Sequence, residues 1–343
     1  MNTRRHLFGL AAVAAAALSL SACGQGGDKA EGGSKNEITF SILSTENSQN
    51  QEQLWAPFLA DMEKQTGLEV KPFFASNYTS LIEAMRFKQV DVGWFSNQSG
   101  LEAVRRANAE VFLRSSDPSG EDGYNSVVIV KANSPLTVED LTRCDKRLTF
   151  GLGDAKSTSG TLAPMTYLFG PKNVDPQACF KTVRSANHEA NLLSVANGLL
   201  DAASNNSTML RLRPEESKRI KVIWTSPRLP EDPIVWRKDL DPAVKEKVRS
   251  FFLSYGTGEG DKAEQERKNL AALSFGVFRP ADDTHLLPVR EMEAMEKVLT
   301  ARAAKDSAKT AAAEKELAAV RSERAAYDAR TAQAPVQPLP SAQ

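Results

Sequence analysis

Short strand-like and helix-like segments alternate from residue 37 to residue 255 of this 343-residue chain. The segment 37–43 alternates apolar and polar residues, and the segment 51–65 repeats apolar residues at helical spacing. The same two patterns then recur along the chain. Strands that alternate with helices favour parallel sheets, which bind ligands at the carboxyl ends of their strands. The sequence therefore predicts an α/β fold with its functional groups at strand ends.

Two irregular stretches divide this pattern, the loop at 115–123 and the proline-containing stretch 227–233. We predict that the chain crosses between two lobes at each of them. Lobe 1 would comprise 36–125 and 233–290, and lobe 2 would comprise 126–232. Two lobes joined by two crossovers enclose a cleft that can close around a ligand by hinge motion.

Residues 151–160 form a glycine-rich turn between a predicted strand and a predicted helix at 161–169. The first N–H groups of a helix lack intrahelical partners and carry partial positive charge, so they bind anions well. Ser157, Thr158 and Ser159 add three hydroxyl donors. The alternative interpretation is that one of these hydroxyls only caps the helix. Taken alone, this stretch does not decide between an anion site and a cap.

The first 22 residues have the pattern of an export signal. Arg4 and Arg5 precede an apolar, alanine-rich core that is shorter than the roughly 20 residues of a membrane-spanning helix, which favours a signal peptide at 1–22. The run Leu-Ser-Ala-Cys ending at Cys23 resembles a bacterial lipobox and predicts lipidation of Cys23; an ordinary cleavage site with an incidental cysteine is the alternative. Residues 23–35 would be a flexible tether, and the protein would be anchored by lipid on the periplasmic side of a bacterial membrane.

The net charge gives no reason to expect a nucleic-acid partner, and the spacing of the cysteines and histidines reveals no metal site. Without residues 1–22, 41 basic and 43 acidic side chains remain, so nothing in the net charge favours nucleic acid. Neither Cys144 nor Cys179 lies near a histidine at metal-ligand spacing. In an oxidising compartment these two cysteines can form a disulfide, and two free buried thiols are the alternative.

The C-terminal region, 291–343, changes composition to alanine, lysine, glutamate and arginine. We expect one long surface helix with a weak apolar face from 291 to about 330, followed by a proline-rich tail from 334. A coiled-coil partner is disfavoured because a strong apolar seam is missing.

Several longer runs carry a family resemblance across most of residues 37–290. They are Tyr78 with 83–87 and 90–94, Gly123-Tyr124, 157–160, His188-Glu189, 195–197, Asn205-Asn206 and 232–239. With these runs the chain resembles the periplasmic phosphonate-binding proteins of bacterial phosphonate ABC transporters. The resemblance implies a two-lobed periplasmic binding protein fold of type II, with the ligand in the interlobe cleft, no cofactor, and delivery of the phosphonate to a membrane permease.

The resemblance also implies a set of ligand contacts. Phenolic, alcoholic and imidazole groups would bind the phosphonate oxygens, and one carboxylate would face the organic end of the ligand, where similar proteins hold an amine. In this sequence the oxygen-binding residues would be Tyr78, Tyr124, Ser157, Thr158, Ser159 and His188, and the carboxylate would be Asp232. Asn206 is a possible further contact.

One position departs from the family pattern. Where similar proteins have an acid after the Asn-Asn pair, this chain has Thr208. Threonine offers no second negative charge, so we expect a smaller preference for 2-aminoethylphosphonate than relatives show.

Other functions are disfavoured on the residues. Ser159, His188 and Asp232 can be drawn as a hydrolase triad, but no G-x-S-x-G nucleophile elbow surrounds the serines. No acidic or histidine cluster offers a two-metal phosphatase site. A binder of phosphite is the nearest alternative, and a structural or adhesin lipoprotein leaves the hydroxyls and aromatic residues at strand ends unexplained.

Overall fold

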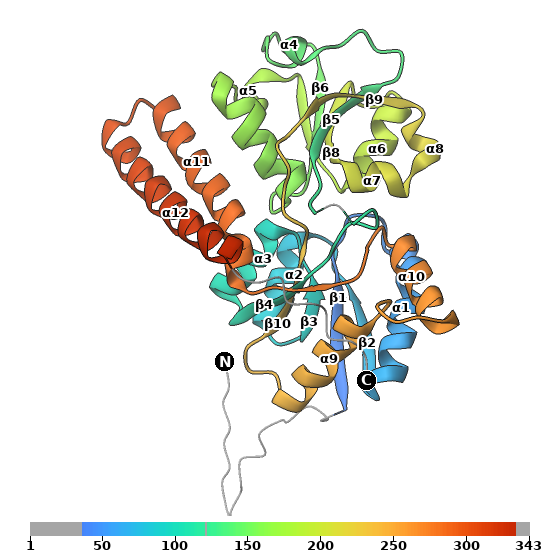
Figure 1. The fold of residues 1–343 in the computed structure, drawn as a ribbon. Helices are drawn as coiled ribbons and strands as arrows, with labels where there is room; N and C mark the ends of the chain where they lie inside the picture. The colour runs from blue at the N-terminus through green and yellow to red at the C-terminus, as the bar shows by residue number, and fades with distance from the viewer. Residues whose placement is uncertain (1–35, 121, 334–343) are drawn as a thin grey trace, which may run out of the picture. The chain divides into compact units, whose positions relative to one another are not determined.

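A computed structural model describes residues 36–333 except residue 121 (Figure 1). Its strands form a six-stranded sheet in the order β11-β4-β10-β3-β1-β2 and a five-stranded sheet in the order β7-β6-β8-β5-β9. The first sheet is built from β1 (Glu37–Ile42), β2 (Glu69–Phe74), β3 (Val92–Trp94), β4 (Ala109–Arg114), β10 (Pro233–Arg237) and β11 (Arg279–Pro280). The second is built from β5 (Ser126–Lys131), β6 (Thr149–Leu152), β7 (Thr182–Ser185), β8 (Ala202–Asn206) and β9 (Ile220–Thr225). All strands of the first sheet fall within the ranges of lobe 1, and all strands of the second within lobe 2.

Both sheets are mixed, so the parallel pairing that the alternation of strands and helices favours holds for only some of the strand pairs. β1 pairs in parallel with β2 and β3, and β6 pairs in parallel with β7 and β8. β10 runs antiparallel to β3 and β4, and β5 runs antiparallel to β8 and β9. The reason is connectivity, because β5 and β10 each enter a sheet directly from a crossover and not through the helix that a parallel return requires.

Helices follow most strands and fill both lobes. Those of lobe 1 are α1 (Ser48–Thr66), α2 (Tyr78–Arg86), α3 (Asn97–Arg106), α9 (Pro242–Ser254) and α10 (Asp261–Ala272). Those of lobe 2 are α4 (Val138–Leu141), η1 (Thr158–Leu162), η2 (Met165–Phe169), η3 (Gly170–Lys172), α5 (Pro176–Cys179), α6 (His188–Ala196), α7 (Ser207–Leu212) and α8 (Pro214–Ser217). Both η1 and η2 are π-helical, a widened geometry that is frequent at functional sites.

Asparagine and serine side chains define where the site-bearing helices begin. Asn77 accepts a hydrogen bond from the Ser80 N–H at the start of α2, and Asn187 accepts one from the Ala190 N–H at the start of α6. Each cap satisfies an N–H that has no partner inside its helix. The caps therefore fix the helix starts that carry the first functional side chains.

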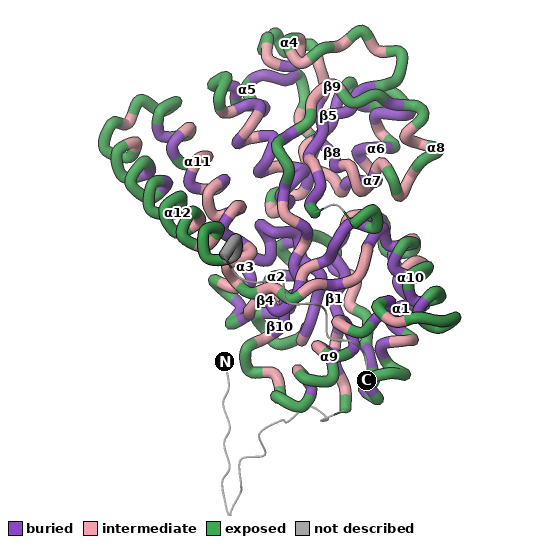
Figure 2. The backbone as a smooth tube through the Cα atoms, viewed as in Figure 1, coloured by how far each residue is buried: buried purple, intermediate pink, exposed green. Residues whose placement is uncertain are grey.

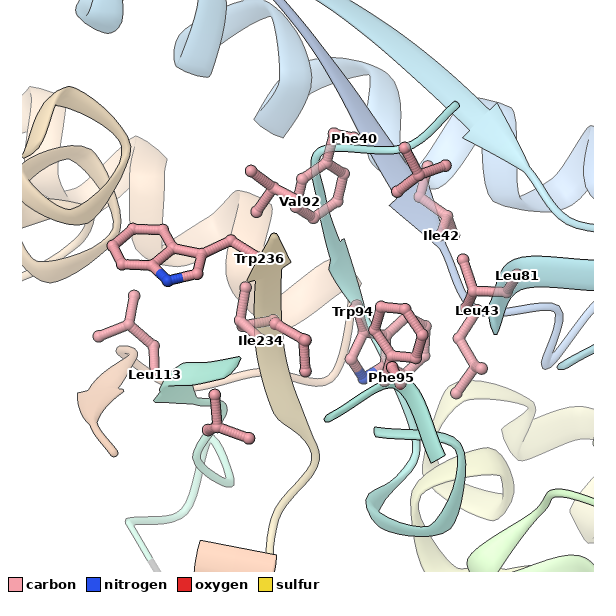
Figure 3. Packing of buried hydrophobic residues seen from close by; sticks show 14 of the residues in the cluster. Phe40, Ile42, Leu43, Leu81, Val92, Trp94, Phe95, Leu113, Ile234 and Trp236 are labelled. Atoms are coloured by element: carbon pink, nitrogen blue, oxygen red, sulfur yellow. The ribbon is translucent and has the colours of Figure 1, made fainter. Parts of the chain in front are cut away.

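The larger apolar core lies around the first sheet. Phe40 on β1 packs against Trp55 and Phe58 of α1, with ring centroids 5.6 and 6.4 Å apart. Figure 3 shows apolar side chains of β1, β3 and β10 converging in this core. The interior of both sheets is buried, and the exposed residues lie mainly on outer helices and loops (Figure 2).

The two crossovers pair with each other between the sheets. The first runs from Arg114 to Ser126 and the second from Thr225 to Pro233. Tyr124 and Leu229 form an antiparallel bridge, with N–H to O distances of 3.0 and 2.7 Å. The two connections between the lobes are thus held together as one short two-stranded link.

The C-terminal region differs from the single surface helix that the composition predicts. It forms η4 (Asp283–Leu286), α11 (Leu287–Ala303) and α12 (Ser307–Gln333), and the last two pack side by side (Figure 1). The break arises because Lys305 adopts a positive φ of 56° and Asp306 caps the next helix through the Lys309 N–H. α11 also packs on α3 and on η2, so it contacts both lobes. Composition alone did not reveal these contacts.

The predicted signal peptide, the tether with Cys23 and the proline-rich tail lie outside the described residues. Among the helices that are described, none has the length and apolar character needed to cross a bilayer.

A disulfide joins Cys144 to Cys179 in lobe 2; the two cysteines are 35 positions apart in sequence, and their Cα atoms are 4.0 Å apart. A covalent loop of this length restricts the unfolded chain. We expect that replacing both cysteines by serine lowers the free energy of unfolding by about 3 kcal/mol. Urea unfolding without reductant measures this change.

Reduction of the wild-type protein is the control, because it should lower stability to the level of the double variant. Counting thiols in unfolded, unreduced protein tests the pairing itself. Two reactive thiols from Cys144 and Cys179 would contradict it.

Candidate functional site

A pocket lies between the two sheets and is lined by residues of both lobes and both crossovers. Its lining residues are Leu43, Thr45, Tyr78, Trp94, Ser96, Ser115, Tyr124, Ser157, Ser159, His188, Asn206, Thr208, Met209, Leu212, Glu231, Asp232, Leu273, Ser274 and Phe275. Most of the side chains that the sequence singled out therefore come together here. Among the described lining residues there is no lysine or arginine.

The hydroxyl end of the pocket is built by the turn between β6 and η1. The Gly153 N–H donates to the Gly160 carbonyl over 2.8 Å, which brings the two backbones close together. A Cβ atom added at Gly160 would lie 2.7 Å from the Gly153 Cα, so only glycine fits there. The Ser157 hydroxyl accepts from the Gly160 N–H at 3.0 Å and begins the helix. Capping and pocket lining are thus compatible roles for the same side chain.

His188 links the hydroxyls of this turn. As the first residue of α6, it places its Nε2 3.4 Å from the Ser157 hydroxyl and 3.3 Å from the Ser159 hydroxyl. Burial lowers the pKa of His188 to about 4, so the imidazole is neutral at neutral pH. The Asn206 amide donates to the Ser159 hydroxyl over 3.3 Å. The result is a set of neutral hydrogen-bonding groups facing one end of the pocket.

Tyr78 reaches the same end from lobe 1. It is the first residue of α2, and its N–H donates to an Asp154 carboxylate oxygen at 3.1 Å, so the start of α2 is tied to the turn after β6. Its side chain is 2% exposed. Burial raises the pKa of the Tyr78 hydroxyl, and the Asp232 and Asp154 carboxylates act in the same direction. The hydroxyl therefore stays protonated and able to donate.

Asp232 lines another part of the pocket wall, from the second crossover just before β10. Its oxygens accept from the Tyr124 hydroxyl at 3.2 Å, the Trp94 indole N–H at 3.2 Å and the Asn97 amide at 3.3 Å. Burial raises the pKa of Asp232 to about 8, and the carboxylate of Glu231 adds to this effect. No ion pair to Asp232 is found within the described residues.

Glu231 is a lining residue that the sequence reasoning missed. One of its oxygens accepts from the Ser115 hydroxyl at 3.2 Å and the other from the Gly123 N–H at 3.1 Å, so its carboxylate braces one crossover against the other. Burial raises its pKa, with Asp117 and Asp122 adding to the rise. The sequence feature that could have identified Glu231 is its position directly before Asp232.

Phe275 is a second lining residue that the sequence reasoning missed. No sequence feature points to it, because its position depends on α10, for which no helix was predicted.

Of the three remaining residues predicted to contact the ligand, two line the pocket and one lies outside its lining. Thr158 is fully buried outside the pocket lining, and its hydroxyl oxygen accepts from the Gln98 N–H of lobe 1 at 2.9 Å. Asn206 is at the end of β8, where its side chain also caps α7 through the Met209 N–H. Thr208 lines the pocket in the first turn of α7.

The geometry separates the members of the hypothetical triad. Asp232 is bound by Tyr124, Trp94 and Asn97, and the His188 Nδ1 atom has no hydrogen-bond partner among the described residues. A hydrolase triad needs the carboxylate on that nitrogen. The described residues also contain no group of three or more histidine, cysteine or acidic side chains placed to hold a metal ion.

The fold and pocket correspond to a class of two-lobed extracytoplasmic solute-binding proteins, and comparisons with known proteins identify the family. The model of the periplasmic substrate-binding proteins of phosphonate ABC transporters matches residues 40–286. The "Phosphonates-binding periplasmic protein" of Escherichia coli K12 is 45% identical over 260 residues, covering 74% of this chain and 75% of the relative. The chain belongs to this family, whose members bind solutes and are not enzymes.

Solved structures show the fold. A binding-protein component of an ABC phosphonate transporter from Pseudomonas aeruginosa superimposes with a TM-score of 0.81 at 40% identity, covering 85% of this chain and 99% of the other. PhnD1 of Prochlorococcus marinus, in complex with methylphosphonate, gives a TM-score of 0.66 at 21% identity, covering 76% and 97%. The predicted type II periplasmic binding protein fold is thereby confirmed. The protein is a phosphonate-binding periplasmic component of an ABC transporter.

Proposed function

We propose that the pocket holds a phosphonate with its phosphorus oxygens at the hydroxyl end and its organic group at Asp232. The observation that carries this orientation is the polarity of the pocket. Ser157, Ser159 and His188 gather neutral donors at one end, and Asp232, a buried carboxyl group with no ion pair among the described residues, lies at the other. An oxyanion is stabilised by the donors of the first group, whereas the Asp232 carboxyl carries a negative charge when it ionises and then favours a cationic group.

Neutral donors suit a ligand that must be released again. Burying an arginine or lysine would carry a large desolvation cost in the empty pocket, whereas hydroxyls and N–H groups bind an oxyanion without that cost. The first N–H groups of η1, at Thr158 and Ser159, have no acceptor within their own helix. In this proposal Thr158 contributes through its backbone, because its hydroxyl oxygen already accepts from Gln98.

The organic end favours a cationic group. Asp232 lies beside Glu231 on the same wall, and Thr208 lines the pocket where similar proteins have an acid. We therefore propose that 2-aminoethylphosphonate is among the ligands, held mainly by Asp232. Small phosphonates without an amine should also bind, as the solved relative that holds methylphosphonate suggests. Phosphite is the alternative ligand.

Binding calorimetry against phosphate, phosphite, methylphosphonate and 2-aminoethylphosphonate tests the proposed function. We expect both phosphonates to bind more tightly than phosphate and phosphite. A protein that binds phosphite or phosphate better than either phosphonate would contradict the proposal.

We further propose that the mature protein begins at a lipid-modified Cys23 and is held at the membrane by that lipid. The support is the lipobox-like run before Cys23 and the polar stretch after it. Mass spectrometry of membrane-extracted protein should find diacylglycerol on an N-terminal Cys23. An unmodified N-terminus at another residue would rule out this anchor.

Single alanine substitutions test the hydroxyl end. Replacing Ser157 or Ser159 removes a donor to a charged oxygen, which typically contributes about 1.5–3 kcal/mol, so each affinity should fall by about tenfold or more. Thr158→Ala keeps the backbone N–H and should act only through the lost Gln98 contact. Calorimetry measures affinity and thermal unfolding measures stability. A lower melting temperature with unchanged affinity would reduce these serines to helix caps.

Substitutions at the other wall test the orientation. Thr208→Glu should raise the affinity for 2-aminoethylphosphonate selectively, by about 1 kcal/mol or more, because a charge-assisted hydrogen bond is added. Asp232→Asn should lower that affinity and leave methylphosphonate binding nearly unchanged. Equal effects on both ligands would mean that neither residue faces the organic end.

The same wall should make amine binding pH-dependent. With a pKa of about 8, the Asp232 carboxyl is mostly protonated at pH 7, and a neighbouring ammonium group lowers that pKa. Binding of 2-aminoethylphosphonate should therefore release a proton, and its affinity relative to methylphosphonate should rise from pH 6 to pH 8. Calorimetry in buffers of different ionisation enthalpy measures the release, which Asp232→Asn should abolish.

A further inference from the structure

One buried carboxylate of lobe 2 is bound by lobe 1 and is not part of the pocket lining. Glu189 is the second residue of α6 and is 7% exposed. One of its oxygens accepts from the Asn47 N–H at 2.9 Å and the Asn47 amide at 2.7 Å, and the other accepts from the Asn50 amide at 2.6 Å. All three donors come from the start of α1, about 140 positions earlier in the chain.

The site on α1 is suited to receive a carboxylate. The first turn of this 19-residue helix contains no acidic residue, although a negative charge is stabilising at a helix N-terminus. Glu189 supplies that charge from the other lobe. The contact is also anchored through the backbone, since the Glu189 N–H donates to the Thr45 carbonyl at 3.2 Å. The two lobes thus share one capping interaction.

Arg213 completes the contact. Its guanidinium group, between α7 and α8 of lobe 2, donates to Glu189 at 2.9 Å and also to Glu46 of lobe 1. Glu46 is 4% exposed, and burial raises its pKa while Arg213 lowers it. The group therefore contains two carboxylates, one cation and two asparagines, with partners on both sides of the boundary between the lobes.

The position of this cluster connects it to the pocket. His188 precedes Glu189 and Thr45 precedes Glu46, and both His188 and Thr45 line the pocket. No backbone connection joins the lobes at this point, since the chain passes between them only at the two crossovers. The hydrogen bonds of Glu189 to α1 can therefore form only when the two lobes are in contact here. A ligand that draws His188 toward it therefore also brings Glu189 to α1.

We propose that Glu189 is a positioning residue that locks the lobes together over the bound phosphonate, acting through Asn47, Asn50 and Arg213 without touching the ligand. This inference rests on the proposed function. When the lobes separate, the same groups are hydrated, so the interaction shifts the balance between open and closed forms without trapping the ligand. The measured affinity scales with the fraction of protein in the closed form.

Two single variants test the lock, one that introduces charge repulsion and one that removes the carboxylate. Asn50→Asp places a carboxylate against Glu189, and Glu189→Ala removes the acceptor. Each should accelerate ligand dissociation and raise the dissociation constant about tenfold, equally for methylphosphonate and 2-aminoethylphosphonate. The double variant Asn50→Asp with Glu189→Gln restores a hydrogen bond between the two positions and should recover most of the lost affinity. Stopped-flow kinetics and calorimetry give these values.

Matched controls separate the lock from other effects. Glu215→Ala removes an exposed lobe 2 carboxylate paired with Lys218 and should leave binding unchanged. Small-angle scattering at a ligand concentration that saturates the wild type but not Asn50→Asp should show a larger radius of gyration for the variant, and ligand-free melting temperatures should agree.

The outcomes distinguish the two proposals. Wild-type protein that binds no phosphonate contradicts the proposed function. Wild-type protein that binds phosphonate, with unchanged dissociation in both single variants or no recovery in the double variant, overturns the lock.

Discussion

The carboxylate of Asp232 is the group on which the arrangement of the site depends. It is buried where the second crossover enters the first sheet, and it collects donors from three places, Trp94 on β3, Asn97 on α3 and Tyr124 on the first crossover. A buried carboxylate is costly unless it is hydrogen-bonded, so these partners are held to it. The same hydrogen bonds orient the Tyr124 ring and fix both crossovers relative to the sheet.

The side chains that line the pocket form two groups that differ in electrostatic character. At one end, His188 is neutral because burial lowers its pKa, and the serine hydroxyls and helix N–H groups present only partial charges. At the other end, Asp232 and Glu231 present acidic groups whose pKa values are raised by burial. In the orientation that we propose, a small zwitterion would align with this difference, and an anion lacking a positive group would still occupy the first end. The pocket would then select the oxyanion and its substituent through separate groups.

Local sequence patterns were sufficient for part of this structure. The turn before η1 was predictable because strand, glycine and hydroxyl residues lie within about ten positions, and the hydrogen bonds that shape it are local. Contacts such as Tyr124 with Asp232 join residues 108 positions apart, and only the family resemblance brought them together. The antiparallel direction of β10 follows from its direct entry from a crossover, and the buried place of Thr158 depends on its contact with Gln98 of the other lobe. The helix break at Lys305 depends on one cap, which alanine-rich composition conceals.

Two kinds of contact join the lobes, and they should respond differently to a ligand. Leu162 and Ala163 of lobe 2 share an apolar cluster with Val289 and Met292 of α11, and apolar burial remains favourable whether or not the pocket is filled. Around the pocket the contacts are polar, as between the Ser96 hydroxyl and the Lys156 carbonyl at 2.9 Å. Water replaces such hydrogen bonds at little net cost. We therefore expect the polar contacts to open and close while the apolar contacts keep the lobes in register. The free-energy difference between the open and closed arrangements would then be small enough for the binding energy of one ligand to select the closed one.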